Sequence, residues 1–84
     1  MQDYVQAARH GEMTFTEAYA QAHNAKIELS KTPNPTNDDF KEFEFLSTQL
    51  RTLTSIITEE ALKSEGYAFN RNTQLWYKTG KEQK

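Results

Sequence analysis

The sequence has no cysteine, only two prolines and three glycines, and no long apolar run. Without cysteine, disulfides and thiolate metal sites are both excluded, which favours a reducing compartment. No stretch approaches the roughly 18 apolar residues of a membrane span. Residues 1–10 also lack the apolar core of a signal peptide. We therefore expect a cytoplasmic protein that does not cross a membrane.

Motifs for catalysis are missing as well. The glycines stand at positions 11, 66 and 80, so no glycine-rich phosphate loop can form, and no serine lies in a G-x-S-x-G sequence. His10 and His23 are thirteen residues apart and do not have the spacing of a zinc-binding pair. A chain of 84 residues also has little volume for a deep pocket. We expect no catalytic residues, no cofactor, no metal site and no small-molecule substrate.

What the sequence does contain is a pair of matched apolar stripes, each with alternating spacings of three and four. This spacing is typical of one face of a helix. A polar loop with Pro33 and Pro35 separates the stripes, and a helix cannot pass through it. We therefore predict an antiparallel helical hairpin in which small side chains face large ones. The stripes are Phe15, Ala18, Ala22, Ala25 and Leu29, and Phe43, Leu46, Leu50, Leu53 and Ile57.

Polar residues predict where the helices begin and end. Asp3 caps a short helix that stops at Gly11, and Thr14 with Glu17 forms a capping box for a helix that ends near Ser30. Thr36 caps the next helix, over residues 37–65, which either continues to Gly66 or breaks near Thr58. In the antiparallel pair we expect Leu29 near Phe43, Ala22 near Leu50, and Phe15 near Ile57.

The C-terminal residues change period. Residues 66–69 and 74–77 are aromatic-rich and flank a polar turn with two asparagines, a pattern typical of a β-hairpin. The predicted fold class is therefore mainly α, within α+β: a short N-terminal helix, an antiparallel helical hairpin and a small C-terminal β-hairpin. Residues 1–78 form a single small domain, and residues 79–84 form a flexible basic tail.

The first functional hypothesis is a small non-catalytic protein-interaction module. Residues 1–65 hold six Lys/Arg and eleven Asp/Glu, a net charge of −5, which suits a basic partner. The partner is either a larger protein, one that handles nucleic acid included, or a second copy in a homodimer. The chain would act as an adaptor or inhibitor, of the kind that small phage or mobile-element genes encode. The candidate partner-binding residues are Phe45, Ile56, Asp38, Asp39 and Glu42.

Both the exposure of this surface and the role of its acids have competing interpretations. Phe45 and Ile56 lie eleven residues apart on one predicted face and mark a partner surface if they stay exposed, but the first helix could equally cover them. Asp38, Asp39 and Glu42 also have a structural role to fill, because negative charge stabilises the N-terminus of a helix.

The alternative hypothesis is nucleic-acid binding through the C-terminal hairpin. Residues 66–84 hold four Lys/Arg and one Glu, a net charge of +3. Aromatic faces stack on unpaired bases, and lysine and arginine neutralise phosphates. The competing interpretation is that the hairpin aromatics close the small core. The candidate residues for this alternative are Arg71, Trp76, Lys78 and Lys81.

Overall fold

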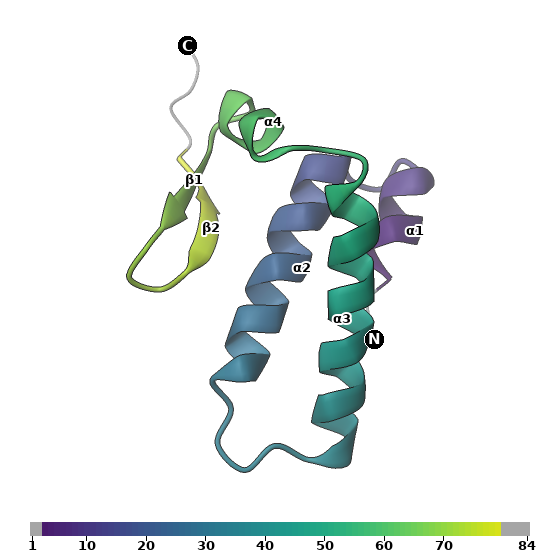
Figure 1. The fold of residues 1–84 in the computed structure, drawn as a ribbon. Helices are drawn as coiled ribbons and strands as arrows, with labels where there is room; N and C mark the ends of the chain where they lie inside the picture. Colours follow the sequence, from purple (N-terminus) through teal and green to yellow (C-terminus); the bar gives the residue numbers. More distant parts are fainter. Residues whose placement is uncertain (1–2, 80–84) are drawn as a thin grey trace.

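A computed structural model describes residues 3–79 as four helices and a two-stranded antiparallel sheet. The long helices α2 and α3 lie side by side and run in opposite directions, and α2 also contacts α1, α4 and β2 (Figure 1). The predicted fold class, mainly α with a small C-terminal β-hairpin, is confirmed. The elements are α1 (Tyr4–Arg9), α2 (Phe15–Ser30), α3 (Asn37–Thr54), α4 (Glu59–Ser64), β1 (Tyr67–Asn70) and β2 (Leu75–Lys78).

Each helix begins at a polar cap. The cap side chain accepts a hydrogen bond from the backbone N–H three residues later, which satisfies one of the free donors of the first turn. Thr36 and Asp39 form a reciprocal capping box. At α2 the Thr14 half of the predicted box is present, whereas the Glu17 carboxylate accepts a hydrogen bond from Gln21. The four caps are Asp3, Thr14, Thr36 and Thr58.

The stretch from Asn37 to Glu65 is not one continuous helix. It breaks after Thr54, and α4 begins after Thr58, so the predicted break near Thr58 is confirmed. The apolar stripe of α3 therefore ends at Leu53, and its predicted extension to Ile57 is wrong. Ile57 lies in the connection and packs with a cluster of residues that does not include Phe15.

The larger core lies where α1, α2 and α3 meet. Two fully buried alanines of α2, Ala18 and Ala22, allow the helices to approach closely, as the small-against-large pattern predicted. The buried Gln49 of α3 accepts a hydrogen bond from the Val5 backbone N–H through its Oε1 atom, over 2.8 Å. We call this group of residues the helical cluster: Val5, Ala8, Ala18, Ala22, Leu46 and Leu53.

A second, smaller core lies under the β-hairpin. Its buried residues are Ala20 from α2, Leu62 from α4 and Trp76 from β2, and we call them the hairpin cluster. An isolated two-stranded hairpin is barely stable in water, so its burial against α2 and α4 is what keeps it folded. None of the helices within residues 3–79 is both long and apolar enough to cross a membrane.

The hairpin register determines which side chains face the helices. Phe69 pairs with Trp76 and Tyr67 pairs with Lys78, so these four side chains share one face of the sheet. In the turn, Gln74 has a positive φ of 64°.

The Asn70 side chain stabilises the turn through hydrogen bonds to its backbone. Its Oδ1 atom accepts hydrogen bonds from the backbone N–H groups of Asn72 and Thr73. At the other end of the hairpin, Thr79 donates two hydrogen bonds to the Gly66 carbonyl. The rest of the predicted tail, residues 80–84, lies outside the described residues.

Candidate functional site

Polar side chains of α2 hold the β-hairpin in place. The Asn24 amide donates to the Trp76 carbonyl and accepts from the Trp76 N–H, both over 2.8 Å. His23 Nε2 donates to the Gln74 carbonyl over 2.9 Å, and Lys31 Nζ donates to a backbone carbonyl of the turn. Because Asn24 satisfies both backbone groups of Trp76, it acts toward β2 as a neighbouring strand would.

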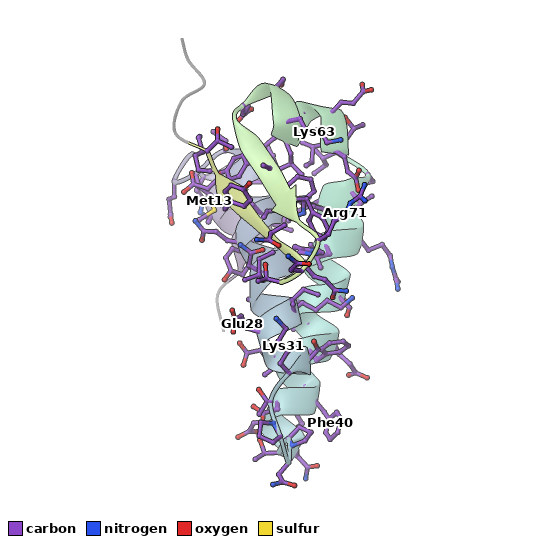
Figure 2. All side chains as sticks on the ribbon, turned by 90° about the vertical axis from the view of Figure 1, so that its left-hand side faces the viewer. Met13, Glu28, Lys31, Phe40, Lys63 and Arg71 are labelled. Atoms are coloured by element: carbon purple, nitrogen blue, oxygen red, sulfur yellow. The ribbon has the colours of Figure 1, made fainter. Side chains whose placement is uncertain are left out.

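This arrangement leaves a cleft between α2, α4 and the hairpin, with a volume of about 450 Å³. Aromatic rings line its interior, and charged side chains stand at its edge. Figure 2 shows Lys63 and Arg71 on the hairpin side of the molecule, where they border this cleft. The lining residues include the rings of Tyr19, His23 and Phe69 and the charged side chains of Glu59, Lys63 and Arg71.

The aromatic rings of the cleft form a continuous row. The His23 ring stacks on Tyr19, with centroids 6.2 Å apart, and meets Phe69 edge to face at 5.8 Å. Phe69 in turn contacts Trp76 at 5.1 Å. Trp76 is only 5% exposed, so its ring closes the hairpin cluster, whereas Phe69 is 40% exposed. The core-closing interpretation therefore holds for Trp76, and Phe69 offers the accessible ring.

The other basic candidates differ in their surroundings. The Lys78 Nζ atom lies 4.8 Å from the centroid of the Tyr67 ring, in a cation–π contact. Arg71 is exposed in the turn, whereas Lys81 lies outside the described residues.

Within the cleft, burial and the nearby charge of Glu59 raise the pKa of the Tyr19 phenol, although a hydrogen bond with Thr54 opposes this shift. The phenol therefore remains neutral at physiological pH.

A second concave surface lies at the opposite end of the molecule, where the loop between α2 and α3 closes the helical hairpin. The groove has a volume of about 220 Å³, and Leu29 and Phe43 line it together, as the antiparallel pairing predicted. Phe40 is 59% exposed on its wall, the highest fraction among the exposed large hydrophobic residues of the described chain. Figure 2 shows Phe40 at the end remote from Lys63 and Arg71. We call this surface the loop-end groove.

The three acidic residues predicted to bind a partner lie in different environments. Asp39 lines the loop-end groove, but its Oδ2 atom also accepts the Thr36 N–H of the capping box over 2.9 Å. Glu42 stands near Tyr4 of α1, whose pKa is raised by burial and then by the Glu42 charge. Asp38 is exposed. No group of three or more His, Asp or Glu within residues 3–79 is arranged to hold a metal ion.

The two predicted apolar contact residues do not share a helical face. Phe45 is half-buried on α3, whereas Ile56 is 46% exposed in the connection between α3 and α4. The prediction of a common face is wrong because α3 ends at Thr54, so the helical geometry that relates positions eleven residues apart does not extend to Ile56.

Sequence reasoning missed the residues that organise both surfaces. Phe40 lies outside the apolar stripe, and His23 and Asn24 are ordinary polar residues in the α2 pattern. Asn24 and Trp76 are 52 positions apart, so no local spacing links them. In comparisons of the chain with protein-family models, curated proteins and solved structures, no match was found.

Proposed function

We propose that the chain is a small non-catalytic protein-interaction module that docks its partner on the loop-end groove. The observation that carries this proposal is the exposure of Phe40, 59%, on the wall of an apolar groove. Aromatic residues, phenylalanine included, are enriched in protein interfaces, and aromatic anchors that fill pockets carry much of the binding free energy. The expected partner inserts an apolar side chain between Phe40 and Phe43.

Charge around the groove indicates the chemistry of the partner. Asp38 and Asp39 stand in the first turn of α3, beside Phe40, and residues 1–65 carry a net charge of −5. Basic residues next to the inserted apolar side chain would complement this rim and speed association. A partner surface that normally holds nucleic acid has this character, so the proposed role is that of an adaptor or inhibitor.

A homodimer is a less favourable occupant of the same groove. Two copies that docked groove to groove would bring the acidic rims together, and like charges facing one another oppose association. Sedimentation velocity of the isolated chain tests this directly. We expect a monomer, and a stable dimer that Phe40→Glu dissociates would replace the heterologous partner with a second copy.

The test of the proposal is site-specific photo-crosslinking at position 40 in lysate of the source cells, with mass spectrometry of the products. We expect one protein to be crosslinked from position 40 and captured stoichiometrically, with nuclease treatment having no effect. In a separate affinity capture without the crosslinker, Phe40→Glu should lose this protein. The matched control is Ile56→Glu, which introduces the same charge at an exposed apolar side chain elsewhere, and it should retain the partner.

Two results would contradict the proposal. One is equal capture by Phe40→Glu and the unmodified chain, which would show that the groove does not contact the partner. The other is loss of all captured protein on nuclease treatment, which would show that nucleic acid, not the loop-end groove, bridges the two proteins. Far-UV circular dichroism of both variants ensures that lost binding does not reflect lost folding.

A further inference from the structure

We propose that the cleft between α2, α4 and the hairpin binds an unpaired nucleotide, with its base against Phe69 and its phosphate between Lys63 and Arg71. This site is separate from the loop-end groove: Figure 2 shows Phe40 at one end of the molecule and Lys63 and Arg71 toward the other. A ligand in the cleft therefore leaves the protein-docking surface free. The two activities can be tested independently.

The ring of Phe69 is positioned as a stacking surface before any ligand arrives. It contacts the Trp76 ring at 5.1 Å and the His23 ring at 5.8 Å, yet it remains 40% exposed. Trp76 is fixed by its two backbone hydrogen bonds with Asn24, and the His23 ring by its bond to the Gln74 carbonyl. Because the His23 and Trp76 rings already pack against Phe69, its ring loses little conformational entropy when a base stacks on it.

The charges at the cleft have the sign that a phosphate requires. Lys63 comes from α4 and Arg71 from the hairpin turn, and both side chains are exposed at the cleft edge. Among the described residues that line the cleft, Glu59 is the single carboxylate, so these residues carry a net charge of +1, whereas the whole chain carries −2. Glu59 is an acceptor suited to an amino group of the base or a hydroxyl of the sugar.

The size of the cleft suits one nucleotide. A volume of about 450 Å³ lies within the range of small-ligand sites, about 300–1,000 Å³. A base can reach Phe69 only if it is unstacked, so a regular duplex does not fit this mode of binding. The nucleotide is either free or one residue of a single strand, and both present the same base and phosphate.

The experiment measures fluorescence anisotropy of a labelled oligothymidylate with the full chain at low salt. We expect saturable binding that weakens as salt is added. Competition then identifies the source of the nucleotide: thymidine monophosphate displaces the oligomer if a free nucleotide suffices, whereas only unlabelled oligomer does so if a strand is required. Equal competition by inorganic phosphate or by a blunt duplex would overturn the proposal, because neither offers an unpaired base.

Variants separate the two contacts. Phe69→Ala should weaken binding by about 5- to 150-fold, the range that the loss of one base–aromatic stack produces. The double variant Lys63→Gln, Arg71→Gln should reduce the slope of log K against log salt by about 0.7, which corresponds to one neutralised phosphate on a single strand. The matched double variant Arg9→Gln, Lys41→Gln removes the same charge from exposed residues outside the cleft and should preserve that slope.

The remaining results of these experiments either support or refute nucleotide binding in the cleft. Absence of binding at low salt, or an equal change of slope in the two double variants, would refute the cleft as a nucleotide site. If Phe69→Ala fails to fold, as judged by circular dichroism, the double variant at the exposed Lys63 and Arg71 still tests the site. Phe40→Glu should bind the oligomer normally, so loss of the protein partner and loss of the nucleotide remain distinguishable.

Discussion

The two buried clusters of this protein are held together by different interactions. The helical cluster joins side chains from α1, α2 and α3, mostly through apolar packing along two long helices. Within residues 3–79 the hairpin cluster has three buried members, and hydrogen bonds from His23, Asn24 and Lys31 to the hairpin backbone complete it. Long helices bury a continuous stripe, whereas a strand of four residues buries too little and needs polar attachment.

This difference separates the two candidate surfaces physically. The cleft depends on the hairpin cluster, because the hairpin supplies Phe69 and Arg71. The loop-end groove depends on the helical hairpin alone, because all its lining residues come from α2, α3 and the loop between them. A change that destabilises the β-hairpin should therefore affect the cleft and leave the loop-end groove intact.

The largest effect is expected from Leu53→Ala in the helical cluster. Leu53 is fully buried, so removing its side chain leaves a cavity and lowers the free energy of unfolding by about 2–5 kcal/mol. Leu62→Ala is the matched change in the hairpin cluster and should cost less, because fewer buried neighbours surround the cavity and they can collapse into it. Urea denaturation followed by far-UV circular dichroism measures both values. A greater loss for Leu62→Ala would place the main core under the hairpin.

A smaller and more local effect is expected from Asn24→Ala. The variant leaves the N–H and carbonyl of Trp76 without their partners, at a cost of about 1–3 kcal/mol. Because this loss falls on the hairpin, fluorescence of Trp76 should report a transition at lower urea than the circular dichroism of the helices. Gln21→Ala, which removes only an exposed bond on α2, is the control. Coincident transitions in Asn24→Ala would show that the hairpin does not unfold separately.

The smallest effect is a decline of stability at alkaline pH that involves both clusters. Burial is the main cause that raises the pKa of Tyr4 and of Tyr67 above 10.0, and nearby glutamates add to it. The folded chain thus retains these two phenol protons at a pH where the unfolded chain has lost them. The stability that the protonated phenols contribute is therefore complete below pH 10.0 and is lost as pH rises through the folded pKa values.

The measurement is the urea midpoint as a function of alkaline pH. Tyr4→Phe removes one such proton beside the helical cluster, and Tyr67→Phe removes one beside the hairpin cluster. Each variant should show a shallower decline than the unmodified chain. A decline that both variants share unchanged would assign the pH dependence to other groups.

The sequence was most informative where structure is local. Caps at Asp3, Thr14, Thr36 and Thr58 bond to backbone three residues away, so their positions could be read directly from residue order. The alanine-rich stripe of α2 likewise predicted which face is buried, because helical periodicity depends only on spacing. The second apolar stripe failed at Ile57, which lies three residues beyond the end of α3 at Thr54 although the apolar spacing continues.

The candidate sites were predicted less well because they depend on exposure. The acids near the start of α3 were identified by type, but the proximity of Glu42 to Tyr4 follows from three-dimensional packing. Among the hairpin aromatics, alternation predicted that some would be buried. Which of them remained accessible, Phe69 rather than Trp76, was decided by contact with α2 and α4.

The sequence by itself determined the order of the elements, the helix starts and the pairing of two apolar stripes, because hydrogen bonds three or four residues apart and side-chain periodicity are local properties. Only the tertiary structure decided how the β-hairpin lies on α2. That placement depends on contacts such as Asn24 with Trp76, 52 positions apart, which burial and backbone hydrogen-bond satisfaction select and no local pattern encodes. The cleft exists only as a result of this long-range placement.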